Sequence, residues 1–162
     1  MTTSRKPDCR FLLANPAHFL ALGFGSGLIT PAPGTWGTLA ALPLAWLLLQ
    51  LGVSGALLAW LTLPLFLLGV WVCGRTGRAL GVADSGHIVW DEIVAMLLVL
   101  AFVPPTPQAW LMAFVAFRFF DIVKPWPIRW LDRHVHGGLG VMLDDILAGI
   151  FATVVLKFID LI

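Results

Sequence analysis

Five hydrophobic runs divide the chain, and each has the length of a helix that crosses most or all of a membrane. They cover residues 38–53, 56–73, 88–103, 109–123 and 141–162. The first two contain no charge and are separated only by a short uncharged turn, which predicts a tight helical hairpin. Since a helix needs about 20 apolar residues to span the hydrocarbon core, the pattern predicts an all-α, polytopic membrane bundle with four or five spans.

The composition agrees with this prediction. Of the 162 residues, 59% are hydrophobic and 12% are charged, whereas soluble domains are about 45–50% apolar and roughly 25% charged. The mean hydropathy is +0.93. A net charge of +1 argues against nucleic acid as a partner, because such proteins need a concentrated basic surface. We expect residues 1–162 to form a single membrane-embedded domain in contact with the lipid bilayer.

The positive charges orient these runs. They precede the first run, lie between the second and third, and lie between the fourth and fifth: Arg5, Lys6, Arg10; Arg75, Arg78; Lys124, Arg129, Arg133. The opposite connections, residues 50–56 and 104–108, contain no Lys or Arg. Because cytoplasmic loops carry the excess of Lys and Arg, the N-terminus and both charged loops are predicted to face the cytoplasm. Pro16 and His18 interrupt the first apolar stretch, so no cleavable targeting segment is expected.

Acidic residues gather where these runs meet the predicted cytoplasmic face. Five of the nine lie there: Asp91, Glu92, Asp121, Asp144 and Asp145. Carboxylates at membrane depth are costly and usually mark function. A hard divalent cation such as Mg²⁺ explains their presence, since it binds carboxylates, waters and substrate phosphates.

Two alternatives stay open for these acids. Asp121 has Arg118 three residues before it and Lys124 three after, so it could form ion pairs along one helical face. Adjacent residues on a helix point about 100° apart, so one member of each Asp91–Glu92 and Asp144–Asp145 pair could bind metal while the other does not. The two remaining acids of the C-terminal half, Asp132 and Asp160, are expected to lie outside the cluster.

The basic loop after the fourth run interleaves Trp126 and Trp130 with Lys124, Arg129 and Arg133. Such a segment suits the level of the lipid headgroups, and Arg binds phosphate through two hydrogen bonds. Simple anchoring by positive charge is the alternative. Residues 25–38, rich in Gly and Pro, are not expected to form a regular helix, and serve either as an anion site or as a turn and helix cap.

No covalent phosphatase nucleophile is evident in the sequence. Cys73 lacks the Arg spacing of a Cys-x5-Arg loop and is expected to be a small buried apolar residue; an Asp-x-Asp pair is also missing. The tripeptide Ser85-Gly86-His87 occurs in acid-phosphatase-type lipid phosphatases, but their basic elements are missing, so His87 is expected beside the site or at the interface. Metal-activated water is the remaining chemistry.

Four segments carry a resemblance to a known family. They are residues 34–38 (GTWGT), 88–92 (IVWDE), 117–127 (FRFFDIVKPWP) and 137–149 (GGLGVMLDDILAG). In order and spacing they resemble the bacterial phosphatidylglycerophosphatase A family. The resemblance implies an enzyme of the bacterial cytoplasmic (inner) membrane that hydrolyses phosphatidylglycerophosphate to phosphatidylglycerol and phosphate with Mg²⁺. Position by position, it points to Asp91, Glu92, Asp121, Lys124, Asp144 and Asp145.

Chemistry then suggests individual roles for these residues. We predict that Mg²⁺ is held by four acids: Glu92, Asp121, Asp144 and Asp145. Asp91 and Asp145 are predicted to be catalytic carboxylates, one of which accepts the proton of the attacking water. Lys124 and Arg129 are predicted to stabilise charge on the phosphoryl group. The sequence does not choose between Asp144 and Asp145 as metal ligand.

Two other function classes remain as alternatives. One is another lipid-headgroup phosphotransfer enzyme, such as a CDP-alcohol phosphotransferase, although its long aspartate motif is missing from the sequence. The other is an ion-coupled transporter, which would place acids near the bilayer midplane and often has an internal repeat. The sequence leaves the oligomeric state, the number of metal ions and the acyl-chain preference open.

Overall fold

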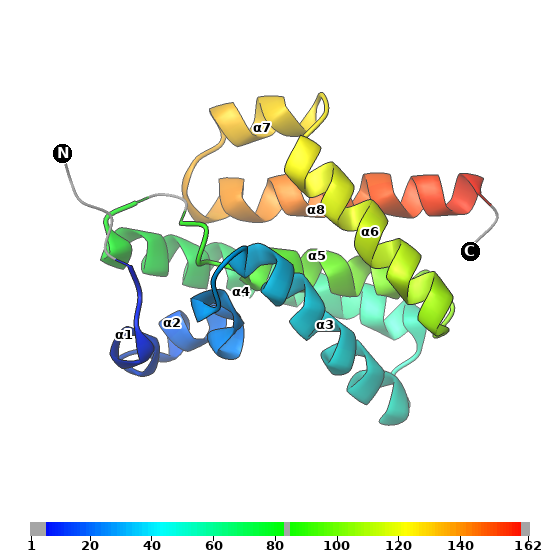
Figure 1. Cartoon of the computed structure of the whole chain (residues 1–162), viewed down its shortest axis with the longest axis horizontal. Coiled ribbons are helices and arrows are strands. Elements are labelled where there is room, and N and C mark those ends of the chain that lie inside the picture. Colours follow the sequence, from blue (N-terminus) through cyan, green and yellow to red (C-terminus); the bar gives the residue numbers. More distant parts are fainter. Residues whose placement is uncertain (1–5, 83–84, 160–162) are drawn as a thin grey trace.

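The computed structural model describes residues 6–82 and 85–159, and within these ranges every regular element is a helix (Figure 1). In chain order these are α1 (Cys9–Leu13), α2 (Pro16–Ala21), the 3₁₀-helix η1 (Gly23–Leu28), α3 (Pro33–Gln50), α4 (Gly55–Leu80), α5 (Trp90–Leu100), α6 (Pro107–Val123), α7 (Ile128–His134) and α8 (Gly137–Phe158). The prediction of an all-α fold is confirmed.

Each of the five hydrophobic runs overlaps one of five helices: α3, α4, α5, α6 and α8. Side chains cap two of them, because Ser54 and Thr106 accept hydrogen bonds from the backbone amides of the first turns of α4 and α6. Helix α4 continues past the predicted end of its run to Leu80. Its last turns contain Arg75 and Arg78, which favour a helix although they end the apolar pattern.

The segment rich in Gly and Pro is more helical than predicted. Residues 25–28 belong to η1, and α3 already begins at Pro33. Proline suits the first turn of a helix, where its missing N–H would have no intrahelical partner. The prediction that residues 25–38 form no regular helix was therefore wrong for most of the segment; residues 29–32 are irregular, and Gly25 has non-helical backbone angles within η1.

Two helices have the length and composition of membrane spans. Among the described residues, α4 with 26 residues and α8 with 22 are long and apolar enough. The third run forms only the 11-residue α5, which is roughly 17 Å long against a hydrocarbon core of about 30 Å. The run at residues 88–103 is thus not a full-length spanning helix, and the total of four or five spans stays a prediction.

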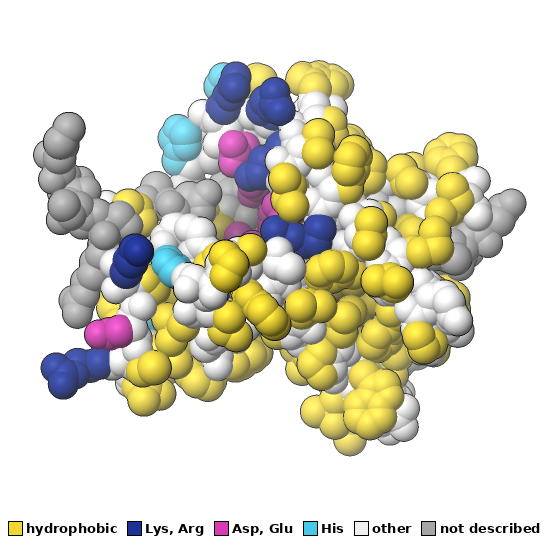
Figure 2. All heavy atoms as spheres, in the orientation of Figure 1, with side chains coloured by type: hydrophobic (Ala, Val, Ile, Leu, Met, Phe, Trp, Pro, Cys, Tyr) yellow, Lys and Arg dark blue, Asp and Glu magenta, His cyan; other side chains and the backbone are white. Residues whose placement is uncertain are grey.

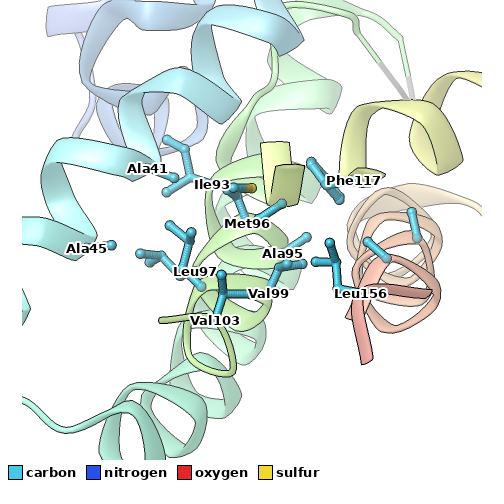
Figure 3. Close-up of a cluster of buried hydrophobic side chains, with 14 of the residues drawn as sticks. Ala41, Ala45, Ile93, Ala95, Met96, Leu97, Val99, Val103, Phe117 and Leu156 are labelled. Carbon is cyan, nitrogen blue, oxygen red and sulfur yellow. The ribbon is translucent and has the colours of Figure 1, made fainter. Parts of the chain in front are cut away.

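Helix α5 lies in the centre of the molecule, surrounded by the longer helices. Its side chains Ile93, Met96 and Leu97 are buried, and Figure 3 shows them between Ala41 of α3 and Phe117 of α6. Helix α8 packs against α4, α5 and α6. A helix enclosed in this way presents its first turn, and the acids on it, to the interior of the bundle.

A very close approach of α8 to α4 sets the position of the acidic pair on α8. A Cβ atom at Gly138 would lie 1.9 Å from the Val70 carbonyl oxygen and 2.7 Å from the Gly74 nitrogen. Only glycine fits there, because any side chain would push the helices apart. The first turn of α8 is thereby fixed on α4, two turns before Asp144 and Asp145.

One face of α4 exposes large apolar side chains that no described residue covers. Trp60 is 75% exposed and Leu67 is 62% exposed, and Leu63 and Trp71 lie on the same face with 55% exposed each. Figure 2 shows hydrophobic side chains over much of the visible surface as well. Monomeric soluble proteins rarely expose continuous apolar patches of this kind, so these surfaces suit contact with lipid.

Candidate active site

Two buried carboxylates and a partly buried one meet between the first turn of α5 and the middle of α8. Asp91, Glu92 and Asp145 each offer one oxygen atom, and these atoms lie within 4.8 Å of one another. Asp91 and Glu92 stand in the first turn of α5, where the helix dipole favours negative charge. We call these residues the carboxylate trio.

Each member of the trio has an oxygen atom without a hydrogen-bond partner in the described part of the chain. These atoms are Asp91 Oδ1, Glu92 Oε2 and Asp145 Oδ2, and all three are buried. Buried charges are normally paired or bound to a metal, because losing hydration is costly. Carboxylate oxygens are the ligands that Mg²⁺ and other hard cations prefer. The donor set of the trio therefore fits a hard divalent cation.

Arg118 on α6 lies beside the trio. Its Nη1 atom donates a hydrogen bond to Asp121, lies 3.8 Å from Glu92 Oε1, and lies 3.5 Å from the Thr38 hydroxyl oxygen. The ion pair of Asp121 with Arg118, left open at the level of sequence, is thus present. Asp121 also lies close enough to Glu92 and Asp145 to repel them electrostatically. Sequence reasoning treated Arg118 only as a helical neighbour of Asp121 and missed its contact with Glu92 and Thr38.

Lys124 connects the end of α6 to α7 and α8. Its backbone is left-handed (φ 45°), which ends α6 and turns the chain. Its Nζ atom donates hydrogen bonds to Asp144 and, at 2.8 Å, to Asp132 Oδ1. Burial lowers the Lys124 pKa, but the two carboxylates more than offset this and hold the pKa above its usual value. Asp132 was expected outside the cluster, yet it shares this lysine with Asp144.

Glycine at position 34 makes room for the trio. A Cβ atom there would lie 2.2 Å from Glu92 Oε1 and 3.2 Å from Arg118 Nη1. The first turn of α3 therefore lies directly against both charged groups. The Thr38 hydroxyl donates to the Gly34 carbonyl oxygen at 2.8 Å, which ties the same turn together.

The remaining predicted residues lie around the trio or apart from it. Arg129 points to the end of α6, where its Nη2 atom donates to the Val123 carbonyl oxygen at 3.1 Å, so its guanidinium contacts none of the trio. His87 lies 2.7 Å from the Gly27 carbonyl oxygen through Nδ1. Cys73 is buried and Cys9 is exposed. Asp160 lies outside the described residues.

Figure 2 shows the acidic side chains recessed in a hollow, with Lys and Arg side chains around it and a hydrophobic surface beyond. This arrangement can bind a cation and, next to it, an anionic group. The trio supplies negative charge for the cation. Arg118 and Lys124 supply positive charge within reach of the same hollow.

Comparison with known proteins gives consistent relatives. The family model described as phosphatidylglycerophosphatase A matches residues 19–160. The chain is 50% identical over 155 residues to phosphatidylglycerophosphatase A of Haemophilus influenzae, covering 94% of both chains. It is 46% identical over 151 residues to phosphatidylglycerophosphatase A of Escherichia coli, covering 93% of this chain and 87% of that one.

A more distant relative bears a different name. A protein of Bacteroides thetaiotaomicron, provisionally named phosphatidylinositol-3-phosphatase, is 35% identical over 144 residues, covering 85% of this chain and 89% of that one. No solved structure matches this chain. The family match covers all four sequence segments and every carboxylate of the site, and the apolar helices α4 and α8 agree with a membrane protein. This chain belongs to the phosphatidylglycerophosphatase A family.

Proposed function

We propose that the protein removes the terminal phosphate of phosphatidylglycerophosphate, releasing phosphatidylglycerol and inorganic phosphate. The observation that carries this proposal is the carboxylate trio, with three buried oxygen atoms that lack hydrogen bonds in the described chain, placed beside Arg118 and Lys124. The names of the relatives from Haemophilus influenzae and Escherichia coli supply the substrate. The reaction is the hydrolysis of a phosphoric monoester.

Mg²⁺ is the cation proposed for the trio. Asp91, Glu92 and Asp145 would hold it, which differs from the sequence-based ligand set by including Asp91 and leaving Asp121 and Asp144 to their ion pairs. When bound, Mg²⁺ supplies Lewis-acid chemistry by neutralising phosphate charge and lowering the pKa of water. The like charge of these three carboxylates, of which Asp91 and Asp145 are buried, supports a bound cation.

The protein's own cations orient the phosphate. Arg118 can hold a phosphoryl oxygen because its guanidinium already lies between Glu92 and Thr38, and Arg suits planar recognition by two hydrogen bonds. Lys124 stays protonated because its pKa is raised, and it adds positive charge beside Asp144. Both cations counter the charge that spreads over the phosphoryl oxygens in the transition state.

A carboxylate next to the trio takes the proton of the attacking water. Asp121 and Asp144 are the two that border the trio, and each forms an ion pair with a cation, Arg118 or Lys124. A general base must lie within hydrogen-bond reach of the proton that it takes, directly or through one water. This proposal needs neither Cys9 nor Cys73.

We also propose a multi-pass arrangement in the bacterial inner membrane, with the site at the cytoplasmic face. Helix α5 is too short to span alone, but α3, α4, α6 and α8 enclose it, so lipid need not reach its ends. The start of α5 bears Asp91 and Glu92, and the end of α6 bears Asp121 with Arg118 and Lys124. The connections at residues 51–54 and 101–106 bear no Lys or Arg, as expected for the opposite side.

A panel of substrates tests the proposed function. Phosphate release from the purified protein in detergent micelles is measured with phosphatidylglycerophosphate, phosphatidic acid, phosphatidylinositol 3-phosphate and glycerol 3-phosphate. We expect the highest kcat/KM with phosphatidylglycerophosphate. Faster release from phosphatidylinositol 3-phosphate would favour that lipid as the substrate, in line with the name of the Bacteroides thetaiotaomicron relative. No release from any substrate would refute the assignment as a phosphatase.

A further inference from the structure

A basic cavity lies beside the carboxylate hollow, between the end of α6 and helix α7. It has a volume of about 340 Å³ and a largely apolar lining from Val123, Pro125, Trp126 and Trp130, to which Lys124, Arg129, Arg133 and His134 add basic groups. No described acidic side chain lines it. The volume falls in the range of ligand pockets, which is about 300–1,000 Å³.

Two cations of this cavity, unlike Lys124, have no acidic partner in the described part of the chain. Among the described residues, neither Arg129 nor Arg133 forms an ion pair, and Arg129 donates only to the Val123 carbonyl oxygen. His134 stacks on Trp130 with ring centroids 4.7 Å apart. Clustered arginines without acidic partners repel each other, so an anion in the cavity would relieve that repulsion and gain hydrogen bonds that Arg forms well.

Lys124 links this cavity to the active site. Its side chain lines the cavity, while its Nζ atom bonds Asp144, the residue next to Asp145 of the trio. A ligand with two phosphate groups would place one beside the trio and the other beside Arg129 and Arg133. Lys124 would then lie between the two phosphates.

The rim of the cavity indicates its depth in the membrane. Trp126 is 81% exposed and Trp130 is 52% exposed, and Ile122, on the last turn of α6, is 69% exposed. Tryptophan is enriched at the level of the lipid headgroups, where its ring is amphipathic. The phosphodiester of a phospholipid lies at that same level, just above the acyl chains.

We infer that this cavity is a second anion subsite, which binds the internal phosphodiester of the phospholipid substrate. The inference rests on the proposed function, because phosphatidylglycerophosphate has a terminal phosphomonoester and, one glycerol unit away, a phosphodiester attached to the diacylglycerol. The trio with Arg118 holds the first group, and Arg133 with Arg129 holds the second. A phospholipid without the internal phosphodiester, such as phosphatidic acid, leaves the subsite empty.

Arg133→Gln is the sharpest test, because Arg133 is exposed and Arg129 also bonds the backbone of α6. Kinetics in mixed micelles gives KM and kcat for phosphatidylglycerophosphate, and inhibition constants for two probes. Phosphatidylglycerol has the phosphodiester alone, and inorganic phosphate reports on the phosphomonoester position. We expect KM and the phosphatidylglycerol inhibition constant both to rise about fivefold, the effect of one basic residue near an anionic headgroup.

In the same variant, kcat and inhibition by inorganic phosphate should stay unchanged, and Arg133→Lys should restore most of the affinity. Arg75→Gln is the matched control, since Arg75 is an exposed arginine on α4 that contacts Trp71 instead of the cavity. An equal rise of KM and of the phosphatidylglycerol inhibition constant in Arg75→Gln would show a general attraction by charge and would overturn the subsite. Unchanged phosphatidylglycerol inhibition, or an equal weakening of inhibition by phosphate, would also overturn it.

Calorimetric binding of short-chain phosphatidylglycerol separates this inference from the proposed function. It needs no turnover, so binding weakened by Arg133→Gln supports the subsite even in a protein that fails to hydrolyse phosphatidylglycerophosphate. Normal hydrolysis with binding unaffected by Arg133→Gln would overturn the subsite alone.

Discussion

Gly34→Ala is a small change that should damage the active site without damaging the fold. The new Cβ atom would lie 2.2 Å from Glu92 Oε1, far inside normal contact distance. The backbone of α3 is held by packing, whereas the Glu92 carboxylate is the free end of a flexible side chain. Glu92 should therefore yield, and its oxygen should move by about 1 Å, a shift that can cost about a hundredfold in rate.

The stability of the protein should respond differently. Alanine favours a helix over glycine by up to about 1 kcal/mol, which offsets the cost of moving one carboxylate. We expect unchanged or slightly higher thermal stability, a higher Mg²⁺ concentration for half-maximal activity, and kcat/KM for phosphatidylglycerophosphate lower by about a hundredfold. Thermal unfolding and phosphate release at several Mg²⁺ concentrations measure these three quantities.

Gly86→Ala is the matched control, because a Cβ atom at Gly86 meets nothing within 4 Å. It should leave both kcat/KM and the Mg²⁺ requirement at the level of the unchanged protein. If Gly34→Ala also retained normal kcat/KM and a normal Mg²⁺ requirement, the Glu92 oxygen would not belong to the productive site. The argument from close packing would then be refuted.

Three further predictions follow from the site. Chelation by EDTA should abolish phosphate release and Mg²⁺ should restore it, with Ca²⁺ a poor substitute because of its looser coordination; full turnover after EDTA and extensive dialysis would contradict a metal mechanism. Glu92→Gln and Asp121→Asn should each lower kcat by about a hundredfold in folded protein. Asp8→Asn should leave kcat unchanged, since Asp8 caps α1 and Asn caps a helix equally well. Equal activity in all three variants would mean that Glu92 and Asp121 are structural. Replacing Cys9 and Cys73 with Ser should leave substantial turnover, and loss of hydrolysis without unfolding would point to a thiol nucleophile.

The sequence by itself determined the five longer helices and the family. Long apolar runs form helices in lipid whatever their exact sequence, because their backbone groups must form hydrogen bonds within the run. That is why α3, α4, α5, α6 and α8 appear where the runs predicted them. The four segments that resemble the family could also be recognised from the sequence, since each consists of neighbouring residues in a fixed order.

The sequence could not determine how far the third helix extends. Residues 88–103 read as one apolar run, yet α5 has only 11 residues. The surrounding helices bury this segment, so the helix need not be long enough to cross the membrane by itself. Burial by other helices is a tertiary property, and hydropathy along the chain does not record it.

Only the tertiary structure decided which carboxylates meet. Neighbours on a helix point in different directions, and the rotation of one helix against another decides which neighbour faces the interior. The close contact of Gly138 with α4 sets that rotation for α8, so that Asp145 joins Asp91 and Glu92 while Asp144 bonds Lys124. The sequence contained every acidic residue of the site, but their division into a cation-binding trio and two ion pairs depends on helix packing.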